Sequence, residues 1–325
     1  MGDPAGIGPV IAWKAWALRK PEQRPFYLIG GIDVMAAAQR VAGIDGRIRI
    51  IRTPEEAGIF ASELPVLGIP CPNPRPGHSD PESAPAIIKS IETAVEHVRA
   101  GRAAAVVTNP IHKALLYRAG FKHPGHTEFL AELSALNGNA PKPVMMLVGG
   151  GLRVALATIH KPLASIPGAL TADLIVEVGR IVHEALKRDF GIASPRIGLC
   201  GVNPHAGEDG EIGREEIEIV NPAAAKLRAE GIDISDARSG DTIFHEALQG
   251  RFDAVIAMYH DQGLIPVKTL DIWGGVNVTL GLPFIRTSPD HGVAYDVAAS
   301  GKAKPESLIA ALDLADRMAI ARAGA

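Results

Sequence analysis

The 325-residue chain has only two cysteines and no long apolar run, and each of these absences argues against one broad class of protein. Its two cysteines, Cys71 and Cys200, cannot build a disulfide framework, and neither lies in a Cys-x-x-Cys motif. No apolar run approaches the roughly 18 residues that a membrane span requires. The sequence therefore predicts neither a disulfide-stabilised secreted domain nor a membrane protein.

The chain also lacks an excess of charge of one sign. Lysine and arginine total 33 against 36 aspartates and glutamates, a net charge of −3, and no basic block occurs. This balance does not favour a nucleic-acid or anionic-membrane partner. The first residues have neither a basic nor an apolar targeting region, so we predict a soluble, cytoplasmic protein. With 47% hydrophobic residues, the chain can bury a core of two domains or one large α/β unit.

Short apolar runs alternate with amphipathic segments along the chain. The sequence predicts strands at 26–30, 103–107, 196–200, 254–258 and about 275–280, and helices at 85–100, 172–188, 214–229 and 305–320. Apolar segments at 144–148 and 153–159 flank three glycines, which predicts a hairpin. Strand–helix alternation with nearly continuous apolar strands is typical of an α/β fold with a largely parallel sheet.

Two regions depart from this rhythm. Prolines concentrate between residues 21 and 76, so we expect long surface loops there. The hairpin near 144–160 suits a second subdomain or an arm that forms a dimer.

Three histidines follow apolar strands directly. His160, His205 and His260 each come at or just past the carboxyl end of a predicted strand, the edge where open α/β sheets bind ligands. Three converging imidazoles suit Zn²⁺, Co²⁺ or a similar cation with one open position. Asp241 and Asp261 are carboxylates available to complete or orient such a site.

Another interpretation of these histidines stays open. Any one of them fits a hydrogen-bonded core or loop residue equally well. Their spacings of 45 and 55 residues match no compact zinc signature. The case for a metal rests on the shared strand-end placement.

Three further segments carry polar groups near glycine. His126 and Thr127 begin a predicted helix after Gly125 and could bind an anion, although Thr127 also fits an ordinary N-cap. Arg286 lies in a predicted long polar loop at 281–292, where it is either a ligand for phosphate or carboxylate or a surface residue. The glycine-rich residues 1–9 match neither the Rossmann fingerprint nor a P-loop.

Several long motifs together closely resemble those of the 4-hydroxythreonine-4-phosphate dehydrogenase family of pyridoxal phosphate biosynthesis. The resemblance covers essentially the whole chain. Its motifs are Gly2-Asp3-Pro4-Ala5-Gly6-Ile7-Gly8-Pro9, Thr108-Asn109-Pro110, Pro124-Gly125-His126-Thr127-Glu128, Asn203-Pro204-His205-Ala206-Gly207-Glu208, Tyr259-His260-Asp261-Gln262-Gly263 and the run from Gly275 to Ser288.

The resemblance implies a three-layer α/β/α fold with two subdomains, similar to isocitrate and isopropylmalate dehydrogenases. It places one subdomain at 1–122 and 278–325, with the nucleotide-binding loop, and the other at 123–277, with metal ligands and dimer contacts. It further implies a homodimer with its active site at the subunit interface and one divalent cation per subunit, zinc, magnesium or cobalt. The residues it assigns are metal ligands His160, His205 and His260, substrate contacts His126, Thr127, Lys268, Asn277 and Arg286, and NAD or NADP contacts His291, Gly292 and Asp296.

The reaction that the resemblance implies is metal-assisted oxidation of 4-hydroxythreonine 4-phosphate by NAD(P)⁺. The 2-amino-3-oxo acid then loses CO₂ to give 3-amino-2-oxopropyl phosphate. Asp241, Asp261 and Lys268 remain candidates for the catalytic proton acceptor. Two alternatives stay open, a paralogue that oxidises 4-phospho-D-threonate or 4-phospho-D-erythronate, and a metal-dependent hydrolase or aldolase.

Overall fold

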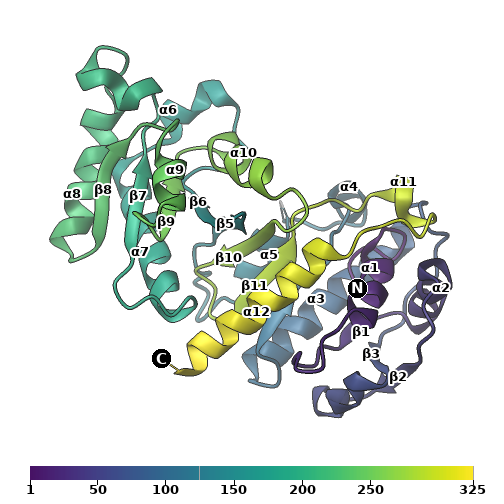
Figure 1. Cartoon of the computed structure of the whole chain (residues 1–325). Coiled ribbons are helices and arrows are strands. Elements are labelled where there is room, and N and C mark those ends of the chain that lie inside the picture. The colour runs from purple at the N-terminus through teal and green to yellow at the C-terminus, as the bar shows by residue number, and fades with distance from the viewer. Residues whose placement is uncertain (124, 325) are drawn as a thin grey trace. The chain divides into compact units, whose positions relative to one another are not determined.

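The structure is a computed structural model of the chain and describes residues 1–123 and 125–324 (Figure 1). Pro124 of the Pro-Gly-His-Thr-Glu motif and Ala325 lie outside the described residues. The chain divides into two compact units, each built from discontinuous segments. The first comprises Met1–Pro141 and Leu282–Asp316, and the second Lys142–Gly281 and Arg317–Ala325. Residues 123–141 and His126 with them therefore group with the first unit.

The first unit contains a small parallel sheet and a further pair of parallel strands. Strands β1 (Leu28–Gly30), β3 (Leu64–Gly68) and β2 (Ile48–Ile51) pair in that order, and β4 (Ala105–Val107) pairs in parallel with β11 (Ile285–Pro289). Its helices are α1 (Gly8–Ala17), α2 (Ile32–Ala42), η1 (Pro54–Ala61), η2 (Pro81–Ser83), α3 (Ala84–Arg99), α4 (Lys113–Arg118), α5 (His126–Leu133), α11 (Tyr295–Ala298) and the first part of α12 (Glu306–Gly324).

Two tryptophans of α1 anchor the core of the first unit. The side chains of Trp13 and Trp16 are buried, and their rings meet edge to face with centroids 5.5 Å apart. Each indole N–H donates to a backbone carbonyl at 2.8 Å, Trp13 to Met35 and Trp16 to Phe60. A buried tryptophan gains stability from its area only when its N–H is paired, so these bonds fix α1 against α2 and η1.

The second unit contributes six strands to a mixed sheet, and helices cover them. Its strands run in the order β10 (Val276–Leu280), β5 (Val144–Gly149), β6 (Leu152–Leu156), β9 (Ala254–Ala257), β7 (Arg196–Cys200) and β8 (Asp233–Arg238). The pairs β10–β5 and β5–β6 are antiparallel, and the remaining pairs are parallel. Its helices are η3 (Leu163–Ser165), α6 (Ile166–Ala169), α7 (Ala172–Arg188), η4 (Pro204–Gly210), the π-helix η5 (Glu216–Val220), α8 (Asn221–Ala229), α9 (Ile243–Leu248) and α10 (His260–Leu270).

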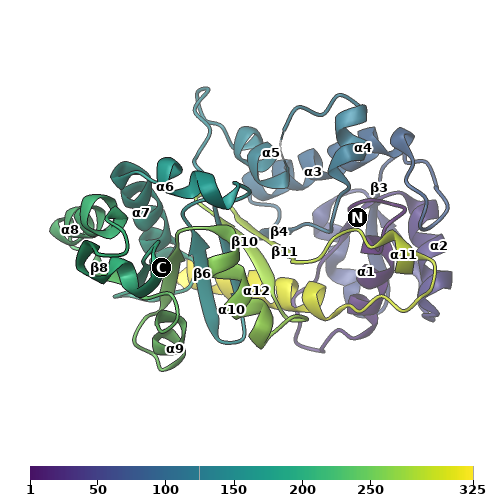
Figure 2. The same cartoon turned by 90° about the horizontal axis from the view of Figure 1, so that it is seen from above.

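Helices lie on both faces of this sheet. Apolar side chains of β6 and β9 pack with those of α9 and α10 in one core cluster, while α7 packs against β5 and β10. Figure 2 shows α7 on one side of β6 and α10 on the other. The second unit therefore has three α/β/α layers, which confirms the predicted α/β fold class.

Most predicted elements are present within a few residues of their expected bounds, and the hairpin at the three glycines is confirmed as β5 and β6. Both strands of the hairpin lie inside the sheet of the second unit, between β10 and β9, and a part of the hairpin in forming a dimer stays a prediction. The proline-dense stretch from 21 to 76 is not simply long loops, since it also contains β1, α2, β2, η1 and β3.

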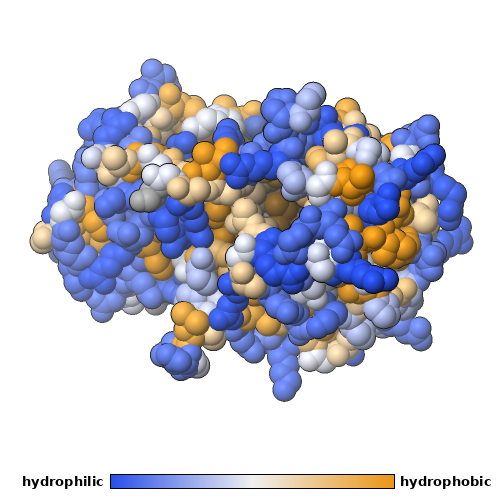
Figure 3. All heavy atoms as spheres, turned by 90° about the horizontal axis from the view of Figure 1, so that it is seen from below, coloured by the Kyte–Doolittle hydropathy of each residue, from blue (hydrophilic) through white to orange (hydrophobic). Residues whose placement is uncertain are grey.

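None of the described helices combines the length and the apolar character that crossing a bilayer would require. On the face drawn in Figure 3, hydrophilic residues predominate and apolar atoms form small scattered groups.

Candidate active site

The three candidate histidine ligands all lie in the second unit, past the carboxyl ends of adjacent parallel strands. His160 follows β6, His260 is the first residue of α10 after β9, and His205 lies in η4 after β7. Since β6, β9 and β7 are neighbours in the sheet, their carboxyl ends share one edge. The predicted strand-end placement is therefore correct for all three.

Two of these imidazoles lie close together. The ring centroids of His160 and His260 are 5.5 Å apart, with planes inclined by 38°. Among residues 1–123 and 125–324, however, no group of three or more His, Cys, Asp or Glu side chains is arranged to hold a metal ion. Within one chain the structure thus pairs His160 with His260 and does not bring His205 into a three-ligand group.

The Asp261 carboxylate makes a hydrogen bond to its neighbour His260. Its Oδ1 lies 2.8 Å from Nδ1 of His260, at the first turn of α10. A carboxylate on one ring nitrogen fixes the orientation of an imidazole and leaves the other nitrogen available for a ligand. Asp261 therefore fits a role in orienting His260.

His205 lies in a turn of left-handed backbone. Residues 205–209 all have positive φ, between 43° and 86°, and only one of them is glycine. Such a conformation costs free energy at each non-glycine residue and persists only when its surroundings hold it. The almost completely buried Glu216 lies beside this segment, where its carboxylate accepts the backbone N–H groups of Val202 at 2.6 Å and Asn203 at 2.8 Å.

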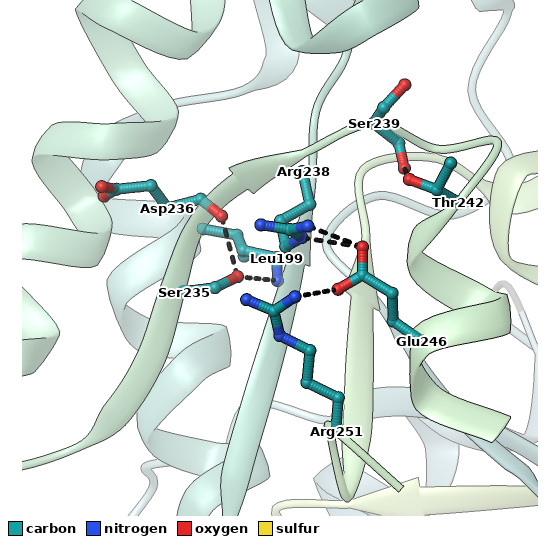
Figure 4. Close-up of polar contacts among 8 residues, drawn as sticks. All are labelled: Leu199, Ser235, Asp236, Arg238, Ser239, Thr242, Glu246 and Arg251. Carbon is teal, nitrogen blue, oxygen red and sulfur yellow. Dashed lines mark hydrogen bonds and ion pairs between the residues drawn. The ribbon is translucent and has the colours of Figure 1, made fainter. Parts of the chain in front are cut away.

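Asp241 is exposed in the turn that joins β8 to α9. Glu246 forms ion pairs with Arg238 and Arg251 next to this turn (Figure 4). Arg238 at the end of β8 donates from Nη2 to Oε1 of Glu246 in α9 at 2.6 Å, and Nη1 of Arg251 forms an ion pair with Oε2 at 2.9 Å. The two guanidinium groups thus hold Glu246 against the end of β8, which restricts where Asp241 can lie.

Lys268 and Asn277 occupy α10 and β10. Lys268 is partly buried in the last turn of α10. The Oδ1 atom of Asn277 is buried and makes no hydrogen bond within the described part of the chain. Its amide is therefore available to a ligand.

Arg286 is in the first unit and is neither a loop residue nor a surface residue. It lies inside β11, opposite Val106 of β4, and only 4% of its area is exposed. Burial lowers the pKa of its guanidinium to about 10, so the group remains cationic at neutral pH. Its Nη2 atom donates to the hydroxyl of Thr108 at 2.7 Å. The predicted loop at 281–292 is wrong because residues 285–289 form a strand.

A positive region surrounds the first residue of α5. Burial and the nearby charges of Arg286 and Lys113 hold the pKa of His126 well below its usual value. Lys113 is a residue that the sequence reasoning missed, because a single exposed lysine at the start of a short helix gives no distinguishing signal. Thr127 is not the N-cap, since Gly125 occupies that position and Thr127 is the second helical residue. An anion near His126 would relieve the repulsion among these groups.

The segment after β11 packs on the glycine-rich N-terminal loop. The backbone N–H of Ile7 donates to the carbonyl of Val293 at 3.0 Å, and the hydroxyl of Tyr295 donates to the buried carboxylate of Asp3 at 2.6 Å. His291 contacts the Gly292 carbonyl through Nδ1 at 3.1 Å. Its Nε2 is buried and makes no hydrogen bond to any described residue. Gly292 and Asp296 in the same segment are exposed.

Polar and ionisable groups past the carboxyl ends of parallel strands are typical of α/β enzymes that act on a small molecule. The positive region in the first unit favours an anionic one. The model of the pyridoxal phosphate biosynthetic protein PdxA family matches residues 22–315. Since that match spans most of the sequence, the chain belongs to this family.

Individual relatives match over nearly their full lengths. The 4-hydroxythreonine-4-phosphate dehydrogenase of Bradyrhizobium diazoefficiens is 52% identical over 99% of this chain and 96% of its own. That of Caulobacter vibrioides is 50% identical with the same coverage. The crystal structure of the Klebsiella pneumoniae enzyme superposes with a TM-score of 0.88 at 39% identity, covering 98% of both chains.

Proposed function

We propose that the chain is an NAD(P)-dependent oxidoreductase that oxidises the secondary alcohol of 4-hydroxythreonine 4-phosphate. The 2-amino-3-oxo acid so formed loses CO₂ to give 3-amino-2-oxopropyl phosphate, a step of pyridoxal phosphate biosynthesis. The observation that carries the proposal is the roughly half identity to dehydrogenases of that name over 99% of the chain.

The positive region of the first unit supports a doubly anionic substrate. The substrate carries a phosphate and a carboxylate, and a buried guanidinium binds either group through charge-assisted hydrogen bonds. Arg286 is such a group, and His126 with Thr127 presents an imidazole and a hydroxyl at the start of α5. Lys268 and Asn277 are the remaining proposed substrate contacts. We add Lys113, whose charge acts on the His126 imidazole.

The family resemblance implies zinc, magnesium or cobalt, and of these the imidazole donors of the histidines favour zinc or cobalt. The adjacent rings of His160 and His260 provide nitrogen donors from two imidazoles, and the carboxylate of Asp261 orients one of them. His205 is the third proposed ligand. A cation bound there would lower the pKa of the substrate hydroxyl and polarise the carbonyl that forms.

Since Asp261 is already hydrogen-bonded to His260, we assign it to orientation of the imidazole. Asp241 and Lys268 are then the candidates that accept the hydroxyl proton. Asp241 is an exposed carboxylate whose turn is held by the Arg238–Glu246 pair, and Lys268 is partly buried. A proton acceptor must reach the substrate hydroxyl directly or through one water. Whether Asp241 or Lys268 does so depends on where the bound substrate lies.

The dinucleotide contacts are proposed at the segment after β11. The buried Nε2 of His291 makes no hydrogen bond to the described residues and can pair with a polar group of adenosine. Gly292 exposes its backbone beside it, and Asp296 offers a carboxylate to a ribose hydroxyl. When bound, the nicotinamide would accept the hydride from the substrate carbon.

We also propose that the enzyme is a homodimer whose subunits share the metal ligands. The support is the family resemblance, which assigns ligands from both chains to one cation. In this arrangement His205 need not join His160 and His260 of its own chain.

The test of the function measures the amounts of reduced nicotinamide and CO₂ formed and of substrate consumed. The purified chain, supplied with a divalent cation, is mixed with 4-hydroxythreonine 4-phosphate and either NAD⁺ or NADP⁺. We expect one reduced nicotinamide and one CO₂ for each substrate consumed. Reduction of neither dinucleotide would overturn the proposal, and substrate loss without reduction would favour a hydrolase or aldolase.

A further inference from the structure

Four neighbouring strand ends in the second unit each lead into a candidate active-site residue. His160 follows β6, His260 follows β9, His205 follows β7 and Asp241 follows β8. Whichever subunit completes each site, a ligand on a loop binds its ion well only if the strand end that carries it keeps a fixed position. Bonds that hold these four strand ends in place therefore matter for binding of the ion.

The side chain of Gln262, in the first turn of α10, joins two of these strand ends. Its Oε1 accepts the backbone N–H of Met258, just after β9, at 2.7 Å. Its Nε2 donates to the carbonyl of Gly201, just after β7, at 2.8 Å. Both groups of one planar amide are thus used, and each makes a bond of ordinary length to backbone.

The same bonds continue to the two outer strand ends. On one side, the hydroxyl and the backbone N–H of Thr158, after β6, donate to the carbonyl of Met258 at 2.7 and 3.2 Å. On the other side, the N–H of Gly201 donates to the carbonyl of Arg238, at the end of β8, at 2.8 Å. One continuous path, Thr158–Met258–Gln262–Gly201–Arg238, therefore crosses the carboxyl ends of all four strands.

Close packing of α10 on the sheet puts Gln262 within reach. The neighbouring Gly263 is buried, and a Cβ atom there would lie 2.5 Å from Cδ2 of Leu156 and 3.1 Å from Cβ of Ala257. Glycine at this position lets the first turn of α10 lie directly on β6 and β9, because a Cβ atom would press on side chains of both strands.

We propose that Gln262 is a positioning residue that fixes the strand ends carrying His160, His205 and His260. It contacts neither substrate nor metal itself and acts through the backbone on either side of the sheet edge. The assignment of the histidines as ligands rests on the proposed function, whereas the bridge made by Gln262 does not.

The test compares Gln262→Met with Gln249→Met. Methionine keeps the length of the side chain and removes both bridging bonds, while Gln249 is an exposed glutamine at the end of α9 in the same unit. Each full-length protein is stripped of metal and titrated with Zn²⁺ against a competing chromophoric chelator. We expect Gln262→Met to lose about 10- to 100-fold in zinc affinity, the loss usual when a residue supporting metal ligands is removed. Gln249→Met should bind zinc as the wild type does.

Two further readouts separate positioning from a general loss of structure. Hydrogen exchange should accelerate at the Met258 amide in Gln262→Met, because its acceptor is lost, while the core of β5 stays protected. Thr158→Val removes one hydroxyl bond of the same path, and we expect a smaller loss of zinc affinity in the same direction. In assays of the enzymatic reaction, kcat of Gln262→Met should fall while its KM for the phosphorylated substrate changes little.

Unchanged zinc affinity in a folded Gln262→Met protein would overturn the inference, as would a wild-type chain that binds no zinc. If Gln262→Met does not fold, Thr158→Val decides, and unchanged affinity there is contrary evidence. The proposed function fails by a different result, the absence of nicotinamide reduction, and the zinc comparison stays informative in that case.

Discussion

At the scale of single residues, the buried cation Arg286 has the most direct consequence for substrate choice. A guanidinium that is 4% exposed and carries its charge at neutral pH favours an anion beside it. Lysine is no equivalent, because only the planar guanidinium offers two parallel donors to a phosphate or carboxylate.

We therefore expect Arg286→Met to reduce kcat/KM for 4-hydroxythreonine 4-phosphate by about 100-fold or more, the cost of leaving a buried anion unpaired. Unphosphorylated 4-hydroxythreonine should lose much less. Measuring both substrates on both proteins gives the coupling between residue and phosphate directly. Equal losses on the two substrates would show that Arg286 does not bind the phosphate.

His126 leads to a prediction about pH. Burial and the charges of Arg286 and Lys113 keep its pKa well below the value near 6.5 that an unfolded chain would show. As the pH falls below about 6.5, the unfolded state takes up a proton that the folded state does not, so the free energy of unfolding decreases. His126→Gln should lose less stability than the wild type between about pH 7.5 and pH 5.5, measured by urea unfolding.

The control is His245→Gln, which changes an exposed imidazole on α9. Its stability should depend on pH as that of the wild type does. If His126→Gln instead loses as much stability on acidification as the wild type, His126 is not the group responsible.

The strand-end positions of the histidines could be predicted from the sequence, whereas the surroundings of Arg286 could not. An apolar run that ends in histidine reveals both the strand and the edge at which it stops. Residues 285–289 contain arginine, threonine, serine and proline, so nothing in their composition marks them as a buried strand. These residues form a strand because they pair with β4 and are buried within the first unit.

At the scale of elements, the turn at 205–209 depends on a carboxylate from another segment. Glu216 of η5 is 1% exposed and accepts hydrogen bonds from the backbone of Val202 and from the backbone and side chain of Asn203. These bonds stabilise the approach to a left-handed segment that is costly on its own.

Removing the Glu216 carboxylate should lower the free energy of unfolding substantially. We expect Glu216→Ala to lower the free energy of unfolding by about 2–4 kcal/mol, since buried donors would be left unsatisfied. Glu216→Gln should cost less, because its carbonyl oxygen can still accept the two backbone N–H groups. Urea unfolding measures both.

Glu218 provides the matched control on the same short helix. It forms an exposed i,i+4 pair with Arg214, so Glu218→Ala should change stability by no more than about 0.5 kcal/mol. A Glu216→Ala protein as stable as Glu218→Ala would contradict the role given to the buried carboxylate.

Periodicity predicted the long helices and the apolar strands, and it failed where elements are short or polar. Strand β8 has the sequence DISDAR, with little apolar character to mark it, and α10 contains both Gly263 and Pro266. These elements form because the neighbouring strand and the sheet surface complete them. Their local sequence alone favours loops.

At the scale of the whole molecule, the sequence motifs identified the family, and the apolar pattern identified the α/β class. The positions of the unit boundaries were less accessible, since a boundary depends on contacts between distant segments. The segment up to Pro141, which includes α5, groups with the first unit, and no local pattern marks that boundary. The proposed dimer is a further property that local patterns cannot define.

A mixing experiment tests the proposed dimer. If a second copy supplies His205, inactive His160→Ala and inactive His205→Ala proteins should form heterodimers with one intact site. Random pairing makes half the dimers mixed, so activity should return to about a quarter of wild type. Mixing His160→Ala with His260→Ala is the control, because these rings lie together in one chain and no rescue is expected. Equal failure of both mixtures, with heterodimers present, would place each site within one chain.

The central claim, that this chain oxidises a phosphorylated amino acid, is tested most directly by comparing two substrates on the wild-type protein. Initial rates of nicotinamide reduction are measured with 4-hydroxythreonine 4-phosphate and with 4-phospho-D-erythronate, which carries a hydroxyl in place of the amino group. We predict that kcat/KM for the amino acid is higher by about tenfold or more, as expected when a site pairs with a polar group that the analogue lacks. A preference of similar size for the sugar acid would contradict the account and make the chain a dehydrogenase of phosphorylated sugar acids.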